Sequence, residues 1–108
     1  MSGASAREGA VAVIAAMPEE AAVLRRSLDA VRRVRRRPEI VIGSLAGTPL
    51  ALCISGDGQR DARAGALALI AAFDVQRLIV IGVSGGLSPE LATFDLVVAA
   101  RVTTETGE

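Results

Sequence analysis

The sequence predicts an α/β protein with a mixed, mainly parallel sheet that is flanked by helices. Short apolar runs of strand length alternate with two amphipathic helical segments, in the order β-α-β-β-α-β-β. Several of these runs end abruptly in glycine or proline, as parallel strands do where they pass into a loop. For 108 residues this predicts one domain at 10–108, after a flexible leader at 1–9.

The first expected elements are a strand at 10–16 and a helix that begins at Pro18 and runs to about Val31. Proline favours the first position of a helix, and two acids follow it where the helix dipole stabilises them. Glu20 shares the inward stripe of the helix with Leu24, whereas Glu19 lies off that stripe. Two interpretations of Glu20 stay open at this point: a helix-terminus acid that bends out to solvent, or a site carboxylate.

The segment from Val31 to Pro38, VRRVRRRP, is the most basic part of the chain. No aromatic side chain interleaves it for base stacking, and the twelve acids of the chain cancel its twelve basic residues, which are all arginine. We therefore expect a solvated helix end and turn here, and no nucleic-acid partner.

The middle of the chain predicts a β-hairpin and a second helix. Apolar runs at 40–45 and 50–54 flank a short glycine-bearing link. A glycine loop then leads into a helix at 59–73. That loop contains Gly56, Asp57 and Gly58. Such loops are more often tight turns than anion cradles.

The remaining strands are expected at 78–83 and at 94–102. The first reads LIVIGV and ends in Ser84-Gly85-Gly86, which is typical of a buried parallel strand that opens into a loop. The strand ends at Met17, Ser55 and Ser84 are expected to lie at one edge of the sheet. Ligands bind at that edge in open α/β sheets.

Composition excludes several kinds of chemistry. The chain has no His and no Lys, so it cannot form a Ser-His-Asp triad, a Schiff-base lysine, a P-loop of the usual kind or a familiar Cys/His zinc site. We expect no metal and no cofactor. The single Cys53 predicts a buried thiol without a disulfide. No apolar run reaches the ~18 residues that span a bilayer, so we expect a cytoplasmic protein without a membrane partner.

Three stretches together resemble the superfamily of purine nucleoside phosphorylases and methylthioadenosine/S-adenosylhomocysteine nucleosidases. They are residues 12–25, 54–70 and 78–99. The resemblance covers nearly the whole chain and corresponds to the N-terminal half of that family, so it implies an incomplete nucleoside-phosphorylase-like fold. It also implies cleavage of the N-glycosidic bond of a purine nucleoside, by water or by phosphate as a co-substrate, in nucleoside catabolism or salvage.

The same resemblance implies roles for individual residues. Glu20 matches the glutamate that orients the nucleophilic water, and Met17 matches a methionine that contacts the ribose. The segment beside the ribose and base is matched by Val83, Ser84 and Gly85. For the loop of Gly56, Asp57 and Gly58 two roles stay open, a phosphate loop or a part of a partner subunit's pocket. Asp57 departs from the apolar residue that the dimeric nucleosidases carry there.

In this family the acid that protonates the leaving base lies in the C-terminal half, which has no counterpart in these 108 residues. The resemblance therefore implies an N-terminal part that is inactive alone. It would act in a homo-oligomer or with a complementary C-terminal half. The alternative is a non-catalytic α/β module that binds a nucleoside or pairs with another subunit.

Overall fold

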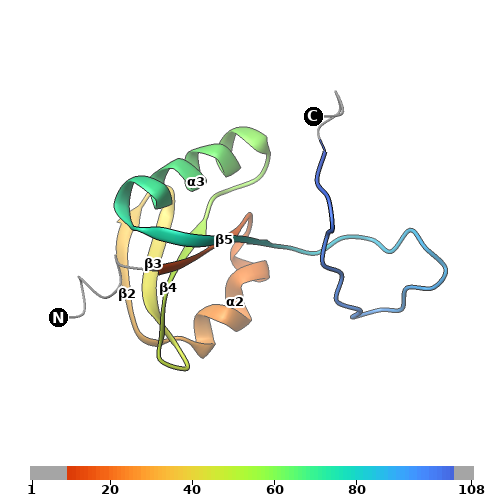
Figure 1. The fold of residues 1–108 in the computed structure, drawn as a ribbon, viewed down its shortest axis with the longest axis horizontal. Coiled ribbons are helices and arrows are strands. Elements are labelled where there is room, and N and C mark those ends of the chain that lie inside the picture. Colours follow the sequence, from red (N-terminus) through yellow and green to blue (C-terminus); the bar gives the residue numbers. More distant parts are fainter. Residues whose placement is uncertain (1–9, 104–108) are drawn as a thin grey trace.

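A computed structural model describes residues 10–103 of the chain; the predicted leader at 1–9 lies outside the described residues. The described part forms a five-stranded sheet with helices on both faces (Figure 1). Its elements are β1 (Ala10–Ala15), α2 (Pro18–Ser27), β2 (Asp29–Arg36), β3 (Glu39–Leu45), β4 (Thr48–Ile54), α3 (Gln59–Ala72) and β5 (Val75–Ile81).

The sheet has the strand order β2-β3-β4-β1-β5 and is mixed, which confirms the predicted α/β class. Three neighbouring strands are parallel: β1 lies between β4 and β5, with Val13 opposite Leu52 on one side and Ile79 on the other. The other two pairings, β3 with β4 and β2 with β3, are antiparallel. The carboxyl ends of β4, β1 and β5 therefore meet at one edge of the sheet.

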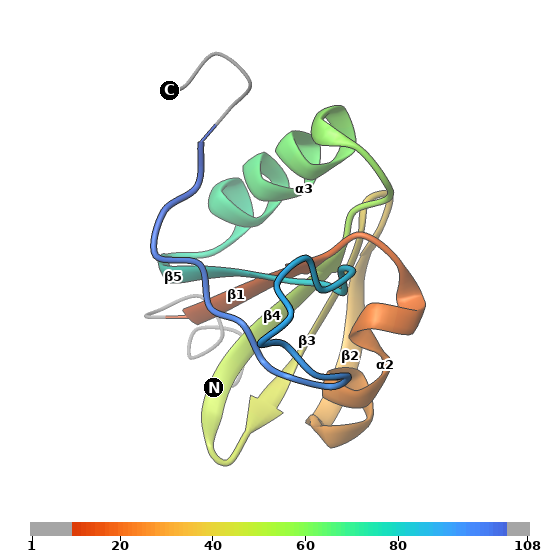
Figure 2. The same cartoon turned by 90° about the vertical axis from the view of Figure 1, so that its right-hand side faces the viewer.

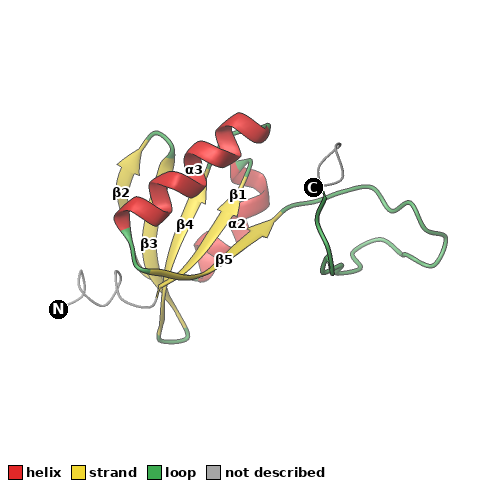
Figure 3. Ribbon diagram, turned by 45° about the horizontal axis from the view of Figure 1, so that its top comes forward, coloured by secondary structure: helices red, strands yellow, loops and turns green. Residues whose placement is uncertain are grey.

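Each face of the sheet has its own hydrophobic core. On one face α3 buries Leu69 against Ile14 and Cys53, and on the other α2 buries Ala21 against Val13. Figure 3 shows the two helices on opposite sides of the strands. Because both faces of β1 are covered, its sequence is continuously apolar and does not alternate between apolar and polar residues.

The predicted hairpin at 40–54 is confirmed as β3 and β4. Leu45 and Thr48 form the last pair before a turn of Ala46 and Gly47. Both turn residues have positive φ, 50° and 84°, as the favoured two-residue hairpin turns require.

The predicted helix to Val31 and the predicted turn at 31–38 are wrong. The helix ends at Ser27, and the basic segment is a strand, β2, which pairs with β3. Leu28, at the end of the helix, has an extended backbone and a buried side chain, so the chain turns there into the sheet. The expected solvation of this segment is correct, since all eight residues of β2 are exposed.

Two predictions for the last part of the described chain are also wrong. β5 is an edge strand and not a buried one, since its five central residues are exposed. No strand forms at 94–102, where the chain is irregular, and Phe94 and Leu96 are exposed by 100% and 90%. Figure 1 shows this segment running clear of the sheet, and in Figure 2 it lies nearer the viewer than the strands. Among the described residues no strand pairs with it to complete a ladder.

No helix in the described part of the chain is long and apolar enough to cross a membrane.

Candidate functional site

The expected meeting of three strand ends is present in the structure. After β4, the Ser55 amide donates to the Ala15 carbonyl and the Gly56 amide donates to the Ala16 carbonyl, both at 2.9 Å. These bonds extend the β1–β4 ladder past the last residues of the strands. They fix the loop after β4 against the start of the loop that carries Met17.

The carboxylate of Glu20 joins the ends of β1 and β5. One oxygen, Oε1, accepts a hydrogen bond from the Met17 amide, and the other, Oε2, accepts one from the Val83 amide, each at 3.1 Å. The two donors are 66 residues apart in the sequence. Hydrogen bonds to a charged carboxylate are stronger than neutral ones, and two donors on different oxygens fix the plane of the group.

Local sequence explains why Glu20 takes this position. Met17 has an extended backbone, Pro18 begins the helix, and Glu20 is its third residue. The Glu20 amide donates to the Met17 carbonyl at 3.1 Å while the Glu20 carboxylate accepts from the Met17 amide, which is the acid half of a capping box. Glu20 is partly buried, whereas Glu19 is exposed. Glu20 is thus an acid of the helix terminus, as one interpretation held, but its carboxylate is directed to the strand ends and not out to solvent.

Gly82 makes room for this arrangement, and the sequence prediction missed it. A Cβ atom at Gly82 would lie 3.0 Å from Oε2 of Glu20. A side chain there would push the carboxylate away from the Val83 amide. The signal in the sequence was a glycine directly after an apolar strand, where another chain segment approaches the backbone closely.

The structure brings only some of the predicted site residues together. Met17, Glu20 and Val83 are joined by the two hydrogen bonds, and the Met17 side chain is 44% exposed. Ser84 and Gly85 line, together with Val83, a hollow of about 630 Å³ that is formed by residues 82–86 and 91–97. Neither Met17 nor Glu20 lines that hollow.

The glycine loop before α3 already uses two of its backbone donors. The Gly56 amide is bonded to the Ala16 carbonyl at 2.9 Å, and the Gly58 amide donates to Oδ1 of Asp57 at 3.0 Å. Gly56 and Gly58 both have φ of +91°, a conformation that glycine adopts without strain. Two amides that a phosphate cradle would present are thus already bonded, one to the segment after β1 and one within the loop.

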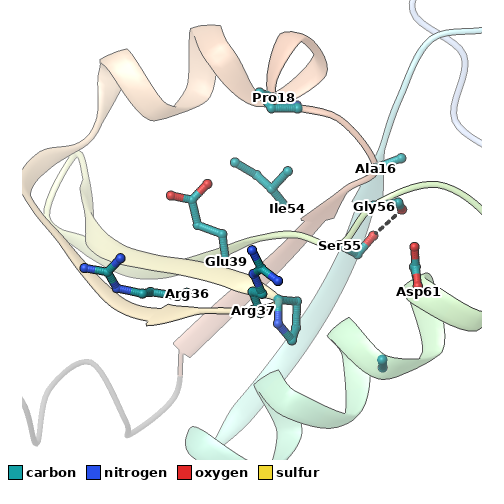
Figure 4. Close-up of a pocket in the computed structure, with 11 residues that line it drawn as sticks. Ala16, Pro18, Arg36, Arg37, Glu39, Ile54, Ser55, Gly56 and Asp61 are labelled. Atoms are coloured by element: carbon teal, nitrogen blue, oxygen red, sulfur yellow. Dashed lines mark hydrogen bonds between the residues drawn. The ribbon is translucent and has the colours of Figure 1, made fainter.

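An open crevice of about 560 Å³ lies on the β4 side of β1 (Figure 4). Its lining residues come from the ends of β1 and β4, the first turns of α2 and α3, and the turn between β2 and β3. They are Ala16, Pro18, Arg36, Arg37, Pro38, Glu39, Ile54, Ser55, Gly56, Asp61 and Ala64. Here the helix after β1 and the helix after β4 leave toward opposite faces of the sheet, which is a topological switch point.

Cys53 is buried beneath α3, beside Gly65, where a Cβ atom would lie 3.0 Å from its sulfur. Burial raises the pKa of its thiol to about 11, Arg35 acts to lower that pKa, and Glu39 acts to raise it. The thiol is therefore neutral at physiological pH and packs as a small apolar group. Among residues 10–103, no three His, Cys, Asp or Glu side chains are grouped to hold a metal ion.

Comparison with known proteins finds sequences similar to this chain among enzymes of one superfamily. The sequence profile described as "Phosphorylase superfamily" matches residues 10–108. Over 93 residues the chain is 36% identical to the 5′-methylthioadenosine/S-adenosylhomocysteine nucleosidase of Baumannia cicadellinicola and 37% identical to that of Mycobacterium tuberculosis. These matches cover 85% of this chain but only 41% and 36% of the two relatives.

Solved structures show the same relationship. A nucleosidase from Neisseria meningitidis in complex with methylthio-immucillin-A has a TM-score of 0.72 and 34% identity. One from S. pneumoniae with a transition-state inhibitor has a TM-score of 0.71 and 31% identity. Each comparison covers 77% of this chain and 36% of the solved chain. The chain thus spans well under half the length of the relatives that it matches.

Proposed function

The chain belongs to the phosphorylase superfamily, and we propose that it forms the nucleophile side of a site that cleaves the N-glycosidic bond of a purine nucleoside. The observation that carries this proposal is the Glu20 carboxylate, held between the ends of β1 and β5 by the Met17 and Val83 amides. Similar chains of known structure include nucleosidases in complex with methylthio-immucillin-A and with a transition-state inhibitor. Met17 and the segment of Val83, Ser84 and Gly85 are the proposed contacts to the ribose and base.

The proposed chemistry uses the fixed orientation of Glu20. Each carboxylate oxygen has more than one lone pair, so an oxygen that accepts one amide hydrogen bond can still accept a second bond from water. A water held in this way loses its proton to the carboxylate as it attacks the anomeric carbon, where positive charge develops as the bond to the base breaks. Because the two amides already fix the carboxylate, little reorganisation is needed when the water reacts.

Water is the nucleophile that we propose over phosphate. Gly56 and Gly58 donate their amides within the chain, which leaves the loop before α3 with fewer donors for a phosphate ion. The relatives named above are nucleosidases, which also favours hydrolysis. For Asp57 the remaining role that we propose is contact with a partner subunit in a homo-oligomer.

We also propose that the chain is inactive by itself. Departure of the base requires an acid that protonates it. Within residues 10–103, the other carboxylates with hydrogen bonds are Asp57 and Asp95, which bind the amides of Gly58 and Ala92 and not those of Met17 or Val83. Activity would then depend on a complementary polypeptide that supplies the acid and covers the open side of the site.

Reconstitution tests this function. The chain is mixed with a polypeptide that covers the part of the M. tuberculosis nucleosidase beyond the matched region, and release of free purine from methylthioadenosine, adenosine and inosine is measured with and without phosphate. We expect release only from the mixture, and no increase with phosphate. Failure to release a purine from any of the three nucleosides would refute the enzymatic proposal, and strict dependence on phosphate would refute hydrolysis.

A non-catalytic module is the second candidate, and exposed apolar surface favours it. Leu78, Ile79 and Val80 of β5 are exposed by 41%, 45% and 75%. Such a surface is typical of a protein that pairs with another subunit. If the chain binds a nucleoside analogue or a second subunit while every reconstituted mixture stays inactive, this candidate replaces the first.

A further inference from the structure

The crevice between β1 and β4 has a cationic side. Arg36 and Arg37 line it at the turn between β2 and β3, and Figure 4 shows the guanidinium of Arg36 directed away from that of Arg37. Neither guanidinium forms an ion pair with any residue in the 10–103 range. The nearest acid of that side, Glu39, is already engaged, because its Oε2 lies 3.5 Å from Arg25 and 3.6 Å from Arg33.

The opposite side of the crevice is acidic. Asp61 lines it from the first turn of α3, and Figure 4 shows its carboxylate directed toward Gly56. A Cβ atom at Gly56 would lie 2.7 Å from Oδ2 of Asp61, so the glycine is what lets the carboxylate take this place. Within the described residues Asp61 also forms no ion pair.

Much of the remaining lining is apolar. It includes Ala16, Pro18, Ile54 and Ala64. A crevice with an unpaired guanidinium group at one side, an unpaired carboxylate at the other and apolar atoms in its lining is complementary to a dipolar ligand. A simple anion would be attracted by the arginines but repelled by Asp61, and a simple cation the reverse.

We propose that this crevice binds a small zwitterion of the amino-acid class, with its carboxylate on Arg37 and its ammonium group on Asp61. The site is distinct from the Glu20 site, because it lies on the β4 side of β1 and Glu20 contacts the end of β5. It contains neither Glu20 nor Val83, and the proposal holds whether or not the chain is a nucleosidase.

Titration of the 108-residue chain, followed by heteronuclear NMR, tests the proposal. The probes are γ-aminobutyrate, butyrate and butylamine, which share one carbon skeleton and differ in their charges. For a ligand of this size we expect a Kd on the order of a millimolar for the zwitterion. Each of the other two should bind about three- to fivefold more weakly, since each lacks one ion pair. Shifts should centre on the amides around Ser55, Arg37 and Asp61.

Substitutions in the crevice test which residue binds each charged group of the ligand. Arg37→Gln and Asp61→Asn should each weaken γ-aminobutyrate binding about three- to fivefold, and Arg26→Gln, an exposed arginine outside the crevice, should leave it unchanged. Unshifted amides of buried Leu52 and Leu69 show that a variant is folded, and Arg37→Ala replaces Arg37→Gln if the latter is not. Butyrate binding as tightly as the zwitterion, insensitivity to Asp61→Asn, or no shifts at tens of millimolar would each overturn the proposal.

Discussion

The two edge strands of the sheet, β2 and β5, differ in their charge and in the regularity of their pairing. β2 carries four arginines, and its pairing with β3 shifts register at two places. β5 carries Leu78, Ile79 and Val80 in its exposed centre, and its pairing with β1 shifts only at the first residue. Charges and bulges on an edge prevent other strands from adding to it, whereas a regular apolar edge favours such addition.

The difference is consistent with the proposal that another polypeptide covers the β5 side of the molecule, while the β2 side faces water. β2 exposes charged side chains, which water solvates well. β5 exposes apolar side chains, and the irregular segment that follows it is also apolar and exposed, with Val83 at 81% and Leu87 at 98%. The Glu20 carboxylate contacts the end of β5 and not the end of β2. The candidate catalytic group therefore lies on the side that the proposed partner would cover.

The largest expected effect distinguishes how the two edges are anchored. Ile81, the last residue of β5, packs against the core beneath α2, whereas Val34 of β2 is 44% exposed and belongs to neither core. Ile81→Ala should lower the free energy of unfolding by about 2 kcal/mol, and Val34→Ala by less than about 0.5 kcal/mol. Urea unfolding measures both. Equal losses would show that the two edges are anchored alike.

The second expected effect is a pH dependence of stability, which tests whether the charge of Arg35 in β2 acts on the buried thiol of Cys53 in β4. The Cys53 pKa is 9.0 in the unfolded chain and about 11 in the folded one. Between these values the unfolded thiol loses its proton and the folded thiol keeps it, so stability falls as the pH rises. The loss by pH 10 should be about 1.4 kcal/mol.

Arg35→Gln should extend this alkaline loss to higher pH, because Arg35 acts to lower the folded pKa of Cys53. Its effect is therefore expected near pH 11 and not at pH 10, where the folded thiol is already mostly protonated. Arg36→Gln is the matched control, and Cys53→Ala should abolish the loss. Unfolding midpoints in urea at pH 8, pH 10 and pH 11 supply the comparison. A loss that persists in Cys53→Ala would assign it to another group.

The third effect concerns the carboxyl end of β5. Gly82→Ala places a Cβ atom 3.0 Å from Oε2 of Glu20, whereas Gly85→Ala meets nothing within 4 Å. Losing the bond to the Val83 amide should destabilise the first variant by about 1 kcal/mol, and the second should be nearly neutral. Combined with Glu20→Ala, Gly82→Ala should cost little more, since the contact is already lost. Additive losses in this double-mutant cycle would contradict the assignment.

The smallest effect on stability, and the most direct on association, comes from charging an edge. Val80→Arg gives β5 the chemistry of β2 and should change the free energy of unfolding by less than about 0.5 kcal/mol, since Val80 is 75% exposed. It should reduce self-association in sedimentation and binding of an apolar dye. Val34→Arg, on the edge that already carries arginines, should change neither. Unaltered sedimentation and dye binding in Val80→Arg would show that the β5 edge does not mediate association.

The parts of the fold that follow from local rules were predictable from the sequence. The hairpin link, the apolar runs of β1 and β4, and Pro18 with its two acids each specify their structure within a few residues. β2 was not predictable in this way. Its arginines suit a solvated helix as well as an edge strand, and only pairing with β3 decides between them.

The site was predictable in part for a similar reason. The helical spacing of Glu20 gave its direction, but the Val83 amide that holds it and the glycine that admits it come from a strand end far along the chain. The strand that was predicted at 94–102 but does not form shows another limit of prediction from sequence. Its apolar pattern is that of a strand, yet a strand needs a neighbour to pair with, and the described chain supplies none there.

The central claim is that Glu20 holds the nucleophile, and a matched pair of variants in the reconstituted mixture tests it most directly. Glu19 and Glu20 are adjacent, but Glu19 is exposed and forms no hydrogen bond to the strand ends among the described residues. Glu20→Gln should lower the rate of purine release by about a hundredfold or more, with KM changed far less, and Glu19→Gln should leave the rate unaltered. Equal rates in the two variants would contradict the account.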